Sequence, residues 1–430
     1  LKAESLGLWP SDYDVALQFT GAGSWECPED VEEIEYLVIS GGGGGGGAEG
    51  GGGGAGGLRL GTGLSVVAGK KYTVTVGGGG TGSTGRGVTG SNGAPTGFQT
   101  EANVRYYVSV GNPGEGNKYY VKTEQNDDAA SNLTPVLKLY EGSTYVFDQS
   151  HPTNAPNHPL RFASDGAPSF TPYTTGVTTN QPSVGVGTAG SGVMIVVASS
   201  APDLHYYCTV HGAMGNEIET LSNVTVNSSG GGGAGAYSNP GGVTSIGHQG
   251  GSGGGGGVAH PGASPYENMV GGNSKTLVSG NGFNNLPISG ENTSRSTLMQ
   301  GFNGGTSQGN GGPQGGAGGG GGGATQDGFE GRGHPLTPNQ GGNGGNGLSS
   351  TISGVSTFYA GGGGGAGIVA PIASLGGLGG GGNGAAQVTP GTKVQNTGED
   401  GTARTGGGGG GGAWGGSSAD NDGDGGDGGS

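Results

Sequence analysis

Residues 34–47 read IEYLVISGGGGGGG, so an alternating apolar segment runs directly into seven consecutive glycines. The alternation over 34–40 predicts a β-strand with one buried face. The glycines that follow have no side chains with which to build a core, so whatever orders them must act through the backbone. Further glycine runs stand at 318–323 and 361–365, which makes such runs a recurring theme of the chain.

Glycine accounts for 116 of the 430 residues, about 27%, where ordinary proteins have about 7%. Collagen is excluded, because its triple helix takes glycine at every third position and the glycines here are consecutive. Two interpretations remain open. The runs are either flexible linkers or polyproline-II-like segments, packed so closely that only glycine fits and held by backbone hydrogen bonds. We expect the ordered arrangement, a polyglycine II lattice with slow amide exchange.

The formal net charge of −16 argues against a nucleic-acid partner, because phosphate binding requires a basic surface. No apolar run approaches the roughly 20 residues of a membrane span, and no signal peptide is visible. The chain opens at Leu1, from which we expect a processed protein or a fragment. Residues 420–425 read DNDGDG, the start of a calcium loop, but no bidentate Glu follows, so we expect a solvated acidic tail.

Four strand-like segments precede the middle of the chain, at 15–19, 34–40, 64–67 and 72–76, the last two joined by a tight turn. The composition changes sharply at 101–227, where glycine thins out and tyrosine and β-branched residues increase. Six or seven short strands at about ten-residue spacing predict an antiparallel β-sandwich there. We therefore expect an all-β protein with a module at 1–100, an inserted domain at 101–227 and a continuation of the first module at 228–430.

One group of residues in the inserted domain has the side chains of a metal site. Cys208, His211 and Met214 lie close together in YYCTVHGAMGNEI, and His158 lies fifty residues upstream in NAPNHPLRFASDG. One thiolate, two imidazoles and a thioether are the ligand set of a blue-copper site. The alternative is that Cys208 and Met214 are core residues, because both types are commonly buried for packing. His151 and His205 are interpreted as surface residues. No Ser-His-Asp or paired-carboxylate arrangement stands out, so we expect no enzyme.

The segment FTGAGSWECPEDVEEIEYLVISGGGGGGG, at 19–47, resembles the glycine-rich domain of phage tail-fibre and tail-tip proteins, especially those of marine phages. The shared pattern is a Gly-Ser-Trp motif, a Pro-containing turn, an alternating strand, a glycine run and a hairpin ending in Tyr-Thr-Val-Thr-Val-Gly. Residues 343–367 and 402–416 resemble the distal part of that domain. The resemblance covers about 15–100 and 228–430. It implies a virion structural protein, with a homo-oligomer as the usual state.

The inserted domain resembles the cupredoxins over about residues 132–226. EGSTYVFDQ matches their second-strand pattern, NHPLRF at 157–162 matches the loop of the first histidine ligand, and 204–215 matches the ligand loop. The resemblance implies a Greek-key β-sandwich with copper held by His158, Cys208, His211 and Met214. A cupredoxin scaffold retained for its shape alone is the other interpretation.

Two functions remain. The first is an extracellular structural and adhesive protein, a virion tail-fibre-like component that attaches to a host cell-surface glycan or protein. Its abundant Tyr, Asn, Ser and Thr suit such contacts. The second is a secreted or cell-surface filament or matrix protein whose blue-copper domain transfers electrons. A coloured, redox-active protein would favour the second function, and a colourless protein without metal would favour the first.

Overall fold

The computed structural model describes residues 4–5, 16–101, 103–125, 132–181, 183–237, 246–258, 271–272, 300–309, 316–332, 340–367, 374–387, 396–415 and 422–430. The chain forms two compact units. The first, the glycine-rich unit, comprises residues 1–70, 74–98 and 225–430. The second, the sandwich unit, comprises residues 71–73 and 99–224. The described residues form β-strands and no α-helix, so the fold is all-β, as the sequence predicts.

The conventional strands of the glycine-rich unit are short. They are β1 (Glu4–Ser5), β2 (Leu17–Gln18), β3 (Gly23–Glu26), β4 (Glu33–Ile39), β5 (Leu58–Ser65), β6 (Lys71–Thr75), β7 (Thr96–Thr100), β17 (Thr225–Ser228), β18 (Leu348–Ser350) and β19 (Thr357–Tyr359), of which β6 and β7 run into the sandwich unit. Strand β4 pairs with β5, and β17, β7, β6 and β3 form a four-stranded sheet in that order.

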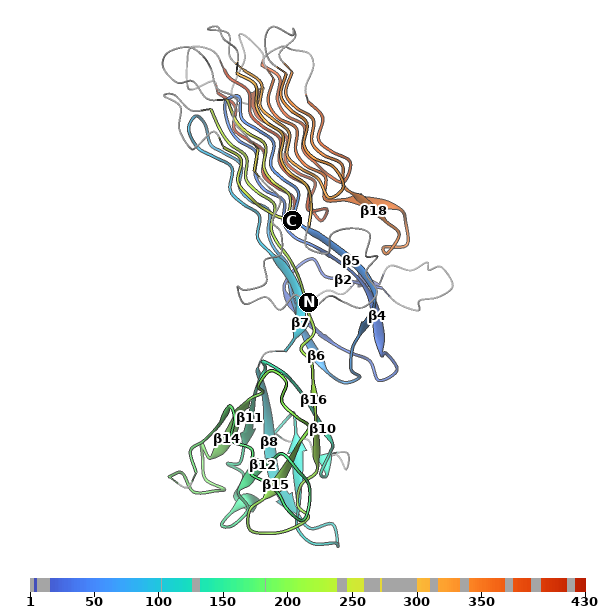
Figure 1. Ribbon diagram of the computed structural model, residues 1–430, viewed down its shortest axis with the longest axis vertical. Helices are drawn as coiled ribbons and strands as arrows, with labels where there is room; N and C mark the ends of the chain where they lie inside the picture. Colours follow the sequence, from blue (N-terminus) through green and yellow to red (C-terminus); the bar gives the residue numbers. More distant parts are fainter. Residues whose placement is uncertain are drawn as a thin grey trace. The chain divides into compact units, whose positions relative to one another are not determined.

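Most of the glycine-rich unit is built from extended segments that lie side by side, visible as the sheaf of parallel traces in Figure 1. The N–H groups of residues 41–46 donate in strict rotation to three different segments. Residues 41 and 44 donate to segment 91–94, residues 42 and 45 to segment 426–429, and residues 43 and 46 to segment 51–54. A partner that recurs every third residue is the signature of three residues per turn, the period of polyproline II.

The carbonyl groups of residues 41–46 accept in the same rotation from three further segments, 231–234, 80–83 and 409–412. Residues 41–46 therefore have six neighbouring segments, and all of their N–H and carbonyl groups are hydrogen-bonded. Glycine is required because the segments are so close: a Cβ added to Gly45 would lie 2.0 Å from the carbonyl oxygen of Gly410. Backbone hydrogen bonds to these six segments offset the conformational entropy that is lost when glycine is ordered.

The described part of the sandwich unit contains nine strands, and a short 3₁₀ helix spans Pro152–Asn154. The strands are β8 (Asn103–Gly111), β9 (Lys118–Lys122), β10 (Leu137–Tyr140), β11 (Thr144–Asp148), β12 (Leu160–Ala163), β13 (Val177–Thr179), β14 (Gly192–Val196), β15 (Leu204–Cys208) and β16 (Glu217–Leu221). Strands β13, β14, β11, β8 and β9 form a five-stranded sheet, and β10, β16, β15 and β12 form a four-stranded sheet.

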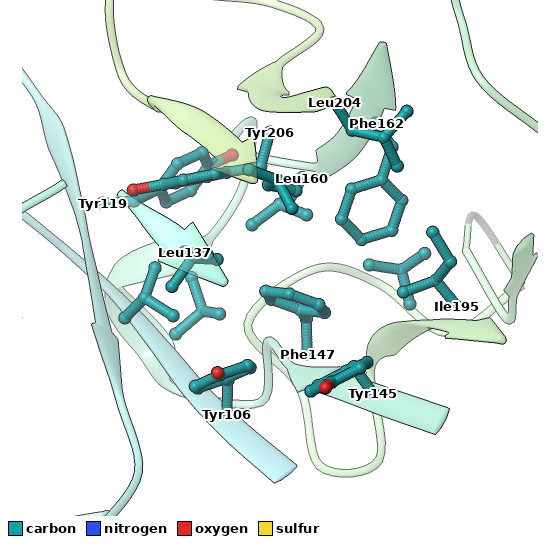
Figure 2. Packing of buried hydrophobic residues seen from close by; sticks show 14 of the residues in the cluster. Tyr106, Tyr119, Leu137, Tyr145, Phe147, Leu160, Phe162, Ile195, Leu204 and Tyr206 are labelled. Atoms are coloured by element: carbon teal, nitrogen blue, oxygen red, sulfur yellow. The ribbon is translucent and has the colours of Figure 1, made fainter. Parts of the chain in front are cut away.

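One core fills the sandwich unit. Phe147 on β11 contacts Tyr106 on β8 and Phe162 on β12, with 5.2 Å between ring centroids in both pairs. Figure 2 shows these aromatic side chains gathered with Leu160 and Ile195. All five side chains are buried, and the strands that carry them alternate inward and outward residues. Aromatic side chains bury large areas, so this cluster gives the unit a core of its own.

Three details differ from the sequence-based expectations. Strands β8 and β11 pair in parallel, as do β10 and β16, so the sandwich is not purely antiparallel. The turn after β5 exists, with Lys70 N–H donating to Val67, but β5 and β6 lie in different sheets and form no hairpin. The described part of the sandwich unit has nine strands, where the sequence predicts six or seven. Alternation identifies a strand but not its partner, because side-chain period carries no pairing information.

The acidic C-terminal segment is not wholly solvated. Asp422 is 1% exposed and forms an ion pair with Arg86, whose guanidinium lies 5.6 Å from the ring centroid of Tyr237 and 5.9 Å from that of Trp414. Asp420 and Asn421 lie outside the described residues. In the part of the chain that the structure describes, no helix has the length and apolar character needed to cross a membrane.

Candidate metal centre

The pairing of β12 with β15 brings the predicted ligands together. These antiparallel strands place Leu160 opposite Cys208, at the end of both strands. The ladder continues by one bond, in which Thr209 N–H donates to the carbonyl of Pro159 at 3.3 Å. In an antiparallel pair, residues that precede Leu160 lie opposite residues that follow Cys208. His158 therefore faces the loop that contains His211. The loop that follows β15 and the loop that precedes β12 thus form one site.

Three of the four predicted ligands form a compact group. One nitrogen each from His158 and His211 and the Sγ of Cys208 all lie within 4.8 Å of one another. The Cys208 Sγ is 3.8 Å from the His211 Nδ1, and the two imidazole rings lie 4.6 Å apart at their centroids. His158 and Cys208 are buried, whereas His211 is exposed. The site therefore has a buried floor and one edge open to solvent.

The buried imidazole is poised to bind an ion. Its Nδ1 is buried and has no hydrogen-bond partner among the described residues. Burial, and next the neighbouring His211, lower the pKa of His158 below its usual value, so the ring stays neutral at neutral pH. A neutral ring with an unshared nitrogen lone pair is the state that coordinates a metal. A buried nitrogen without a partner is costly, and a bound metal would satisfy it.

Met214 lies in the same buried core cluster as Cys208 and is 1% exposed. Its loop is tied to β9, since Tyr119 N–H donates to the Met214 carbonyl at 2.9 Å. Of the other two histidines in the sandwich unit, His151 is exposed and contacts the hydroxyl of Thr153. His205 lies on the opposite face of β15 from Cys208 and is half-buried, 3.9 Å from Glu217. Neither belongs to the site.

Two supporting residues were not singled out from the sequence. Gln149 is fully buried and brackets His158: its Nε2 donates to the His158 carbonyl and its Oε1 accepts from Leu160 N–H, both at 2.9 Å. The Tyr119 hydroxyl donates to the same carbonyl at 2.9 Å. The sequence alternation along and just after β11 could have identified Gln149, because it places Tyr145, Phe147 and Gln149 on the same inward face. A glutamine there must be paired.

The donor set fits a soft transition metal. Zinc ligands of these types lie about 2.0–2.3 Å from the ion, so donors on one ion are about 3.3–4 Å apart. The 3.8 Å between Cys208 and His211 already meets this spacing, and the limit of 4.8 Å on the set leaves a small contraction. A thiolate with two imidazoles suits copper or zinc, and not magnesium or calcium, which prefer oxygen. The site could therefore bind a metal.

Comparison with known proteins gives one family match. Residues 18–132 match the model of a family described as a glycine-rich domain. The match includes the first glycine runs and strands β3–β7, and it continues into the sandwich unit as far as residue 132. No curated protein matches the chain.

Proposed function

We propose that the protein is an extracellular structural and adhesive component, a virion tail-fibre-like chain that takes part in attachment to a host surface. The observation that carries this proposal is the glycine lattice, in which each peptide group of residues 41–46 bonds to one of six neighbouring segments. Along residues 41–46 this lattice has no side chains and is held by backbone groups alone. Its chemistry suits a stiff support that carries a second unit.

Labelling of the source material tests this role. Antibodies raised against the full chain should decorate the tail or fibre ends of virus particles in electron micrographs, and should lower the fraction of particles that adsorb to host cells. Pre-immune antibodies at the same concentration serve as the control. Label found along cellular filaments, with none on particles, would overturn the virion assignment and leave a cell-surface matrix protein.

The sandwich unit supports a second proposal, a copper site on a cupredoxin-like scaffold. The grouping of His158, Cys208 and His211 carries it, with the orphaned Nδ1 of His158 as support. Met214 is buried close by in sequence and in the same core cluster, which favours a soft thioether over water as a further donor. Copper held there would supply one-electron redox chemistry, while Gln149 and Tyr119 hold the His158 backbone.

Copper titration tests the site. Adding Cu(II) to the full chain should produce an intense visible thiolate-to-copper band, and Cys208→Ser should abolish it. Met214→Leu should keep the band and shift the reduction potential, because an axial thioether bond is weak. Cys27→Ser is the matched control, since Cys27 is the other free thiol and lies in the other unit. Stoichiometric Zn(II) binding without a copper band, or a band that survives Cys208→Ser, would overturn the copper assignment.

A further inference from the structure

Arg161 on edge strand β12 stands on the outer face of the sandwich unit, on the face opposite the core residues Leu160 and Phe162. Its Nη1 donates to the Leu160 carbonyl at 2.7 Å and to the Gln181 Oε1 at 2.9 Å. Gln181 is itself held, because its Nε2 donates to Gln149 at 3.1 Å and to Ser191 at 2.9 Å. The guanidinium is therefore fixed in position by groups that are themselves fixed.

No counter-ion for Arg161 lies among the described residues of the sandwich unit. Its Nε and Nη2 donate to none of these described residues. The position across the ladder, where a carboxylate could neutralise it, holds Tyr207. Half-burial lowers the pKa of Arg161, and the neighbouring Tyr119 and Tyr207 oppose this shift only in part. A partly desolvated cation without an anion is unfavourable, so the arrangement favours an external anion.

A cavity of about 280 Å³ opens beside this guanidinium. Arg161, Gln181 and Asn157 line it with polar residues, and the rest of the lining is Pro156, Pro159, Gly185, Val186 and Val210. The volume is close to the lower end of small-molecule sites, which span roughly 300–1,000 Å³. Apolar walls with one fixed cationic group match a ligand that has an apolar body and one anionic head.

We propose that this cavity, the Arg161 pocket, binds a small organic carboxylate whose head pairs with the free Nε–Nη2 edge of the guanidinium. That edge is the planar, two-donor side with which arginine binds carboxylates. The prolines and valines contact the body of the ligand. The pocket contains none of the metal-binding side chains, so its occupation requires no metal.

Calorimetric titration of the metal-free full chain with benzoate tests the pocket, because benzoate combines a carboxylate with a compact apolar ring. One site per chain is expected. Arg161→Gln should weaken binding by about tenfold or more, the loss expected for a charge-assisted pair. Arg105→Gln is the matched control, since Arg105 lies in the same unit but is exposed and already pairs with Asp148 at 2.8 Å. It should bind benzoate as the parent chain does.

A second variant and a second ligand separate loss of binding from loss of folding and test the role of charge. Val186→Trp, which fills the cavity and leaves Arg161 in place, should also remove binding, so a folding defect of one variant does not decide the result. Benzamide, which has the same ring and no charge, should bind at least about tenfold more weakly. Benzoate binding that is unchanged in Arg161→Gln, or acetate binding as tight as benzoate, would overturn the proposal. Neither result bears on the copper site, which the titration does not involve.

Discussion

Gln149 is the residue on which the geometry of the candidate metal centre depends most. Its amide spans the segment that contains His158, with one hydrogen bond on each side of Pro159. The side chain is fully buried, so its loss leaves the Leu160 N–H without a partner, whereas the His158 carbonyl keeps its hydrogen bond from Tyr119. It also accepts from Gln181, and in this way it links the candidate metal centre to the Arg161 pocket.

Replacement of Gln149 by leucine should therefore affect stability and metal affinity together. We expect a loss of about 1–3 kcal/mol in unfolding free energy, because the buried Leu160 N–H loses its partner and the leucine recovers only part of this cost by burial. Metal affinity should fall by about 10–100-fold, the usual cost of losing a residue that holds a metal ligand in position. Urea unfolding and metal titration measure the two effects. Unchanged affinity in a folded variant would show that Gln149 serves packing alone.

Glu49 is a buried carboxyl in the glycine-rich unit, and burial raises its pKa to about 8. A hydrogen bond from Gly316 and the charge of Arg86 oppose this shift only in part. Because the folded-state pKa lies above the unfolded value, the folded state binds the extra proton between pH 4.5 and 8. The stabilisation from this proton is complete below pH 4.5 and is lost as the pH rises through 8.

The variant Glu49→Gln should remove this pH dependence. Glutamine keeps the size of the protonated acid and cannot ionise, so the variant should be more stable than the parent chain near pH 8 and similar to it near pH 4. The difference should grow by at most about 1.4 kcal/mol per pH unit. Denaturant unfolding at several pH values measures it. Parallel stability curves for the two proteins would show that Glu49 is ionised in the folded state.

At the scale of elements, the glycine segments tolerate substitution according to what each Cα faces. A Cβ at Gly45 would lie 2.0 Å from the Gly410 oxygen, whereas one at Gly78 would meet nothing within 4 Å. Gly45→Ala should destabilise the glycine-rich unit by about 1–3 kcal/mol or more, the cost of overpacking. Gly78→Ala should be neutral or stabilising by up to about 1 kcal/mol, because alanine has fewer unfolded conformations. Equal midpoints in guanidinium unfolding would contradict the close packing.

The sequence predicts the elements better than their partners. Alternation locates β4, β6, β8, β9, β11 and β14–β16, because apolar and polar side chains alternate along a strand with one buried and one exposed face. The glycine runs have no side chains and therefore no such alternation. Nothing in residues 41–46 predicts that their N–H groups donate to carbonyl groups as distant in sequence as those of 426–429. Grouping of His158, Cys208 and His211 follows from ligand chemistry and spacing, whereas Gln149 acts through backbone contacts that only the fold reveals.

At the scale of the whole molecule, the chain leaves the glycine-rich unit after Phe98 and returns at Thr225. The strands on either side of this excursion, β7 and β17, are neighbours in one sheet. Thr100 N–H also donates to the Val224 carbonyl at 2.9 Å, so the two chain ends of the excursion are adjacent. A short turn could therefore close the gap.

Replacing residues 101–223 with Asn-Gly should leave the glycine-rich unit folded. The variant would also carry Tyr72→Thr, because Tyr72 packs with Tyr140 of the removed segment and would otherwise be exposed. Amides of residues 41–46 should keep the slow hydrogen exchange of the full chain, as measured by mass spectrometry. Exchange at random-coil rates would show that the sandwich unit is needed to hold the lattice together.

The three-way bonding of residues 41–46 has a mechanical consequence. A flat β-sheet is strong along its hydrogen bonds and weak across its faces, and a terminal strand can be peeled away one bond at a time. A segment enclosed by six neighbours has no weak lateral direction and no free edge from which a tear can begin. Pulling such a segment out along its axis requires the simultaneous shear of bonds on every side, so the bundle should resist bending equally whichever way it is loaded.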